Sequence, residues 1–265
     1  MQQESPITVR KHIRKGKLKQ STSGLAPGYV QCNLVILPKK YADDFSKFCQ
    51  LNPKSCPLIA TSENAGDFAI EKLGFDLDLR TDIPLYRIYE HGELIMETRN
   101  ILDIWQDDFV AFLLGCSFSF EEALLAEGIE IRNISEGKNV PMYKTNINNV
   151  PVNQFSGNMV VSMRPMKPED AIKTVGICSQ FPKVHGAPIH IGDPNFLGIS
   201  NIEKPDFGDA VTIKEGEVLV FWACGVTPQL AIKNAKPSIC VTHSPGYMLV
   251  TDIKNSQLRV AGARK

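Results

Sequence analysis

The stretch "DFVAFLLGCSFSFEEALLAEG", residues 108–128, decides the fold because two hydrophobic patterns meet in it. Residues 109–114 form an apolar run of the length of a buried strand, and a turn follows at Gly115. The next residues have helical spacing up to Gly128, and Ser119 with Glu122 has the spacing of a capping box. The stretch therefore predicts a strand, a tight turn and a helix with Ser119 as its N-cap.

The same order recurs in "GEVLVFWACGVTPQLAIKNAK", residues 216–236. A strand is followed by a turn at Gly225 and by a helix with Thr227 as N-cap and Pro228 at its first position. Both strands are apolar throughout rather than alternating, which is typical of parallel sheets covered on both faces. We therefore predict an α/β fold with a mostly parallel or mixed sheet covered by helices.

Strand and helix patterns in the rest of the chain extend this prediction. We expect further strands at 29–38, 56–62, 158–165, 238–243 and 247–253, and further helices at 39–53, 66–74 and 167–181. The middle of the chain, 144–215, is rich in Gly, Pro, Asn and Asp. We predict a smaller α+β domain there, inserted into a main α/β domain formed by 1–143 together with 216–265.

Composition and charge narrow the classes of partner and compartment. Lys plus Arg equals Asp plus Glu at 29 each, so nothing points to nucleic acid or a membrane surface. No apolar run approaches the roughly 18 residues of a spanning helix, and the first residues lack the apolar segment of a signal peptide. Seven scattered cysteines without a CxxC fit reduced thiols. We predict a cytoplasmic protein, and expect the basic run 10–19 to be a solvated face or a frayed terminus.

The two strand-to-helix turns are candidate binding sites for a carboxylate. A helix N-terminus offers free N–H groups and the positive end of the helix dipole. Cys116 and Cys224 stand in these turns, where a thiol can become a nucleophile or can be buried and inert. Ser119 and Thr227 either bind substrate or only cap their helices.

The histidines are candidates for groups that transfer protons. In "VHGAPIHIGDP", residues 184–194, His185 and His190 are five apart with Gly and Pro between them, which excludes a helical metal-ligand pair. A loop metal site with Asp193 or His243, a structural turn and a proton-handling role stay open. His243 and Arg164 each end a predicted strand, and Arg164 could clamp a carboxylate or lie on the surface.

Several cofactor motifs are missing from the sequence. It has no G-x-x-x-x-G-K-[ST], no G-x-G-x-x-G after a strand and no G-x-S-x-G elbow. We therefore predict chemistry without ATP, NAD or flavin, and no cofactor.

Seven motifs in order resemble the hydro-lyase family related to D-glutamate cyclase. They run from about Gly24 to Asp252 and read "GLAPGYVQCNLVILP", "GCSFSFE", "NVPMYKTN", "VVSMRP", "HGAPIHIGDP", "GEVLVFWACGVTPQ" and "THSPGYMLVTD". One departure is Asn149, where the family pattern has a cysteine, so no thiol nucleophile is expected there. The resemblance implies an α/β fold with a second small domain and a carbon–oxygen lyase activity. A fold and a family do not identify the substrate.

The resemblance suggests dehydrative cyclisation of D-glutamate to 5-oxo-D-proline, without a metal. Our hypothesis assigns proton transfer to His185 and His190, and carboxylate binding to the turn of Cys116, Ser117 and Ser119. Asp193 would orient a histidine or hold the ammonium group. Weaker candidates for substrate binding are Glu121, Asn146, Arg164, Cys224, Thr227 and His243. The partner is a small carboxylate, and homo-oligomer formation stays open. Two alternatives also stay open, a non-catalytic carboxylate-binding protein and a metal-dependent hydrolase or dehydratase.

Overall fold

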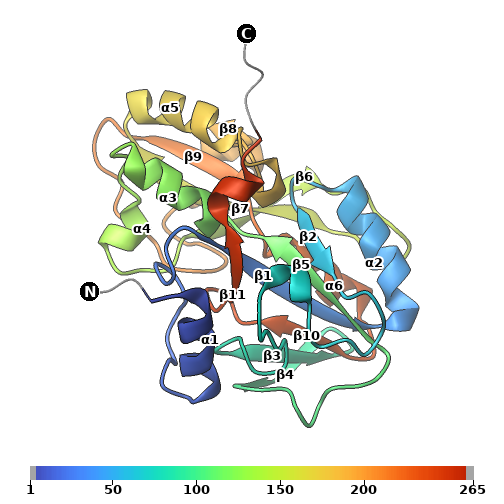
Figure 1. Ribbon diagram of the computed structural model, residues 1–265. Helices are drawn as coiled ribbons and strands as arrows, with labels where there is room; N and C mark the ends of the chain where they lie inside the picture. The colour runs from blue at the N-terminus through green and yellow to red at the C-terminus, as the bar shows by residue number, and fades with distance from the viewer. Residues whose placement is uncertain (1–3, 261–265) are drawn as a thin grey trace.

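The apolar segment 29–38 forms β1 (Tyr29–Pro38), the strand around which the larger sheet is built. The structure is a computed structural model that describes residues 4–260 (Figure 1). β5 (Phe109–Gly115) pairs with one edge of β1, from Cys32 opposite Gly115 to Pro38 opposite Phe109. The other edge of β1 is shared by β11 (Leu249–Lys254) and β10 (Cys240–His243). The sheet order is β2-β5-β1-β10-β3-β4, with β2 (Leu58–Thr61), β3 (Tyr86–Glu90) and β4 (Glu93–Thr98).

Every strand pairing in both sheets is antiparallel, so the prediction of a mostly parallel or mixed sheet is wrong. Alternate side chains of β1 enter two different cores. Leu34 packs in the cluster that contains Phe120 of α3 (Phe118–Ala126), and Val35 packs in the cluster that contains Phe45 of α2 (Lys39–Leu51). Because helices cover both faces, the strand is apolar on both faces apart from the buried amide side chains of Gln31 and Asn33. The continuous hydrophobic pattern therefore indicates that the strand is buried on both faces, and it does not indicate whether its neighbours are parallel or antiparallel.

A second sheet has the order β6-β7-β9-β8, formed by β6 (Met142–Asn148), β7 (Asn158–Met166), β9 (Val218–Ala223) and β8 (His190–Ile191). α5 (Pro168–Cys178) lies beside α3 over this part of the molecule (Figure 1). The short helical turns η2 (Pro182–Val184) and η3 (Pro194–Leu197) flank β8. The sheet combines strands from both sides of residue 215, and the division into two domains stays a prediction.

α6 (Thr227–Ala235) connects the two sheets. It follows β9 of the smaller sheet, yet its residues Ala231 and Ile232 pack in the same cluster as Val35 of β1. This crossing brings the start of α6 toward the end of β5 in the larger sheet.

Two local predictions are wrong. The segment 66–74 contains only the short turn η1 (Glu71–Leu73) and not a helix. A helix of this length is marginal in water unless it buries an apolar face, and here Phe68 is exposed. In α1 (Pro6–Arg14) the basic run is not wholly solvated, because Arg10 is buried and donates to Asp252 over 2.8 Å.

The hairpin of β3 and β4 was not predicted. Nearly every residue of β4 is exposed, so the strand lacks the alternation that reveals a half-buried strand. The short helix α4 (Arg132–Ser135) and the turn η4 (Asn255–Leu258) complete the described elements.

Candidate functional site

The two strand-to-helix turns meet at one small cavity of about 30 Å³. Cys116 and Ser117, between β5 and α3, lie on one side, and Cys224 and Gly225, between β9 and α6, lie on another. His243, the last residue of β10, also lines the cavity. The structure thus brings together four of the residues predicted from the sequence, namely Cys116, Ser117, Cys224 and His243.

Close backbone packing explains the glycine in each turn. A Cβ at Gly115 would lie 2.1 Å from the carbonyl oxygen of Lys183, so η2 packs directly on the end of β5. A Cβ at Gly225 would lie 2.2 Å from Nδ2 of Asn33. Neither distance leaves room for a side chain, and both turns are therefore held against neighbouring segments.

The two cysteines of the cavity are thiols near neutral pH. Burial raises the pKa of Cys116 to about 12 and that of Cys224 to about 11, although backbone N–H groups at the helix starts lower both values. Only the thiolate is an effective nucleophile. Of the two alternatives for these cysteines, the raised pKa values favour unreactive thiols, with Cys116 buried and Cys224 half-buried.

His243 is a neutral side chain with one ring nitrogen already in use. Its Nδ1 lies 3.1 Å from the backbone nitrogen of Leu34, whose N–H donates to it, and 3.3 Å from the carbonyl oxygen of the same residue. The shorter of the two contacts favours the neutral form with its ring proton on Nε2. Burial lowers the pKa of His243 to about 4, and the charge of Arg87 contributes. Nε2 is therefore the nitrogen left for a ligand, to which it can donate a hydrogen bond.

Two asparagines of the cavity were missed in the sequence. Asn33 lies in the middle of β1 and is only 4% exposed, and Asn139 is half-buried at the side of Gly246. Asn33 could have been recognised as a site candidate, because it is a polar residue inside the apolar run "YVQCNLVILP". Asn139 stands in a polar loop, and nothing in the sequence distinguishes it from its neighbours.

Arg164 is buried beneath the turn between β5 and α3 and does not lie on the protein surface. Its guanidinium is fully buried, forms an ion pair with Glu121 and donates to the hydroxyl oxygens of Ser117 (3.0 Å) and Ser162 (3.2 Å). These contacts occupy the group that was predicted to clamp a carboxylate. Arg164 and Glu121 instead support the turn that carries Ser117.

The capping predictions for both helices are wrong. The N-cap of α3 is Ser117, and the buried hydroxyl of Ser119 has no hydrogen-bond partner within residues 4–260. The N-cap of α6 is Val226, while the hydroxyl of Thr227 accepts the N–H of Val160 over 3.0 Å. Thr227 therefore joins α6 to β7.

His185 and His190 have separate environments. His185 is buried, its Nδ1 lies 2.9 Å from the carbonyl oxygen of Lys54, and burial lowers its pKa to about 4. His190 is half-buried in β8, where its Nε2 lies 2.8 Å from the carbonyl oxygen of Asp193. Neither histidine lines the cavity.

Asp193 and Asn146 also lie away from the cavity. The Asp193 carboxylate accepts the N–H of Asn195 at the start of η3, and the exposed Asn146 donates to the carbonyl oxygen of Phe196 over 3.4 Å. With His190, these residues form a group beside η3.

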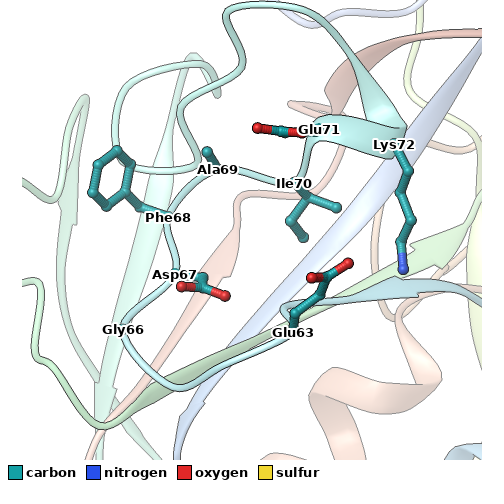
Figure 2. A pocket seen from close by; sticks show the side chains of 8 residues that line it. All are labelled: Glu63, Gly66, Asp67, Phe68, Ala69, Ile70, Glu71 and Lys72. Carbon is teal, nitrogen blue, oxygen red and sulfur yellow. The ribbon is translucent and has the colours of Figure 1, made fainter.

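Larger hollows exist elsewhere on the surface. Figure 2 shows one of about 360 Å³, lined by the segment from Glu63 to Lys72. Its ionisable side chains, Glu63, Asp67, Glu71 and Lys72, are exposed or half-buried and are supplied by one loop. The small cavity, in contrast, combines three buried polar side chains from different segments, Asn33, Ser117 and His243, with two helix starts. We therefore place the candidate site there.

Comparison with known proteins identifies the family. The sequence pattern of D-glutamate cyclase matches residues 110–252, a range that includes both turns and His243. The chain belongs to the D-glutamate cyclase family. A relative from Verminephrobacter eiseniae is 58% identical over 96% of this chain and 92% of its own, and one from Staphylococcus haemolyticus is 56% identical over 97% and 98%.

These family members share a name. Both relatives, and a protein from Bordetella pertussis that is 55% identical over 94% of this chain and 90% of its own, are called "Putative hydro-lyase". Among solved structures, a nitrogen repressor-like protein from Methanococcus jannaschii matches 92% of this chain and 97% of its own, with a TM-score of 0.39 and 11% identity. That likeness is too low to support any statement about activity.

Two further observations concern metals and membranes. Within residues 4–260, no three His, Cys, Asp or Glu side chains are grouped as a metal ion would need. In the same part of the chain, none of the helices has the length and apolar character needed to cross a bilayer. Metal independence and a cytoplasmic location stay predictions.

Proposed function

We propose that this member of the D-glutamate cyclase family is a carbon–oxygen lyase that converts D-glutamate to 5-oxo-D-proline at the small cavity. One observation carries the proposal: the starts of α3 and α6 and the ring of His243 line the same buried space. Two positive helix ends favour a carboxylate there. The names of the relatives support the lyase class.

The reaction needs no oxidant or nucleotide. The amine nitrogen of glutamate attacks its side-chain carboxyl carbon, a C–N bond forms, and a C–O bond breaks to release water. The ammonium group must lose protons, and the departing oxygen must gain them. Holding glutamate in a folded conformer supplies part of the rate, because positioning can lower a barrier by several kcal/mol.

The helix starts and His243 would have different roles in this reaction. Backbone N–H groups at the two helix starts would bind the reacting carboxyl and stabilise the negative charge of the tetrahedral intermediate. His243 would donate from Nε2 to the departing oxygen. A space of about 30 Å³ is small, so it would take only one end of a substrate, such as a carboxyl group. The rest of the substrate would lie outside it, on the side of the half-buried Asn139.

Incubation of the purified protein with D- and L-glutamate tests the proposal, with 5-oxoproline measured by chromatography. We expect product from D-glutamate, and loss of most activity in His243→Gln. The control is His12→Gln, because His12 lies in α1 and does not line the cavity. Turnover of a hydroxy acid but of neither glutamate enantiomer would disprove cyclisation and leave the lyase class standing. Alanine variants of His185 and His190 in the same assay test their predicted part in proton transfer.

One observation favours a second candidate, a protein that binds a small carboxylate without converting it. The titratable side chains that line the cavity, Cys116, Cys224 and His243, have pKa values of about 12, 11 and 4, far from neutral pH. A site for acid–base catalysis usually contains a group that titrates near the working pH. Tight binding of D-glutamate without product after long incubation would favour this candidate.

A further inference from the structure

We propose that Asn33 is a positioning residue that sets the distance between the two turns of the cavity. The inference rests on the proposed function, because it concerns the same site. It adds a residue from a third element, β1, which lies outside the family match at residues 110–252.

The amide of Asn33 is bound to the end of β5. Its Nδ2 donates to the carbonyl oxygen of Gly115 over 2.8 Å and lies 3.5 Å from that of Leu114. Asn33 is 4% exposed, and a buried amide without partners would be costly. These two carbonyl groups also fix which side of the amide is nitrogen. The first turn is thereby tied to the centre of the larger sheet.

The same amide lies against the second turn. A Cβ on Gly225 would lie 2.2 Å from Nδ2, 2.6 Å from Cγ and 2.7 Å from Oδ1 of Asn33, so the Gly225 backbone packs on the whole amide group. Gly225 follows β9, which belongs to the smaller sheet. Asn33 therefore separates two turns that come from different sheets.

This arrangement controls the anion-binding groups of the proposed site. The N–H groups at the start of α3 follow Gly115, and those at the start of α6 follow Gly225. Hydrogen bonds to a carboxyl group weaken when donors move by about 1 Å, and such shifts reduce catalysis strongly. A smaller residue at position 33 would let the turns approach each other and would change the spacing of the donors.

Gln31 provides a matched control in the same strand. It is also 4% exposed, and its Nε2 donates to two backbone carbonyl oxygens, those of Thr22 (2.9 Å) and Leu25 (3.1 Å). It does not line the cavity. Replacement of either amide side chain by alanine removes comparable buried hydrogen bonds, but only one replacement affects the turns.

The first test compares Asn33→Ala with Gln31→Ala. We expect similar losses in thermal midpoint, because each variant loses hydrogen bonds of the same kind. By calorimetry, we expect Asn33→Ala alone to weaken binding of 5-oxo-D-proline by roughly tenfold or more, the equivalent of about one buried hydrogen bond. In turnover of D-glutamate, we expect Asn33→Ala to lower kcat with Gln31→Ala unchanged. Unchanged binding in Asn33→Ala, or equal weakening in both variants, would overturn the proposal.

A second test needs no ligand. Gly225→Ala places a methyl group against the Asn33 amide, and we expect a large drop in thermal midpoint. Combined with Asn33→Ala, which removes the atoms that clash, the same change should lower the midpoint much less. Additive effects would show that Asn33 does not hold the turns apart. If the wild-type protein neither binds 5-oxo-D-proline nor forms it, the proposed function fails, and this pair still decides the role of Asn33.

Discussion

Removing the charge of Glu121 is predicted to destabilise the protein, because it leaves Arg164 without its partner. Arg164 is fully buried and Glu121 is 4% exposed, so water cannot replace the lost contact. Breaking a buried ion pair at one partner costs about 3–5 kcal/mol. Glu121→Gln keeps the shape of the side chain and removes only its charge.

The other contacts of Arg164 place the expected loss at the low end of that range. The guanidinium still donates to the hydroxyls of Ser117 and Ser162, and it lies 5.2 Å from the ring centre of Trp222 and 5.7 Å from that of Phe120. A glutamine oxygen also accepts a hydrogen bond. We therefore expect Glu121→Gln to lose about 3 kcal/mol of the free energy of unfolding.

Urea unfolding at pH 7 measures this loss. Glu122→Gln is the control, because Glu122 is the next residue of α3 and is exposed. Its carboxylate accepts a hydrogen bond from Asn255 over 2.9 Å, which a glutamine oxygen can also accept, and we expect the change to alter stability by less than about 0.5 kcal/mol. Replacing the pair together by Arg164→Met and Glu121→Leu should recover much of the loss, since an apolar pair carries no unpaired charge. A loss below about 1 kcal/mol in Glu121→Gln would refute the reasoning. It would show that the buried guanidinium of Arg164 does not need the Glu121 carboxylate to balance its charge. Arg164 would then again be a candidate for binding a substrate carboxylate.

Three further predictions concern the surroundings of the cavity. Gly115→Ala should destabilise strongly in thermal unfolding, because its Cβ meets a backbone oxygen, whereas Gly176→Ala in the exposed face of α5 has open space and should be neutral or stabilising by up to about 1 kcal/mol. The pKa of His243 is lowered from 6.5 to about 4, so the unfolded chain binds the extra proton between these values and stability is lost as the pH falls below 6.5. His243→Gln should reduce that dependence by roughly 1.4 kcal/mol per pH unit in urea unfolding, and an unchanged slope would contradict the assignment. Cys116 and Cys224 should react slowly with a thiol reagent at pH 7.5 until the protein unfolds, and fast reaction of Cys116 in the folded protein would contradict its raised pKa.

The sequence predicted where strands and helices lie better than how they pair. The strand at 29–38 and the strand-turn-helix at 108–128 are confirmed, because buried positions are mostly apolar and the hydrophobic pattern shows them directly. When helices cover both faces of a sheet, parallel and antiparallel strands have the same hydrophobic pattern. The sequence therefore did not show the strand direction, and the predicted fold class was wrong. The hairpin of β3 and β4 was missed for the opposite reason, since an exposed strand has no buried face to show.

The candidate site depends on pairings between distant strands, and spacing in the sequence could not predict it. His185 and His190 are five residues apart, but the first lies against Lys54 and the second lies in β8, and neither lines the cavity. Cys116 and His243 are far apart in the chain and line the same space, because β5 and β10 pair with opposite edges of β1.

A residue in the middle of β1 can therefore reach both edges of the proposed site. Asn33 is placed there, between the end of β5 and the turn after β9. Its polarity was visible in the sequence, but its meaning depends on which strands flank it. The same reasoning predicts that the effects of Asn33→Ala and Gly225→Ala will be coupled, although Asn33 lies in the larger sheet and Gly225 follows a strand of the smaller sheet.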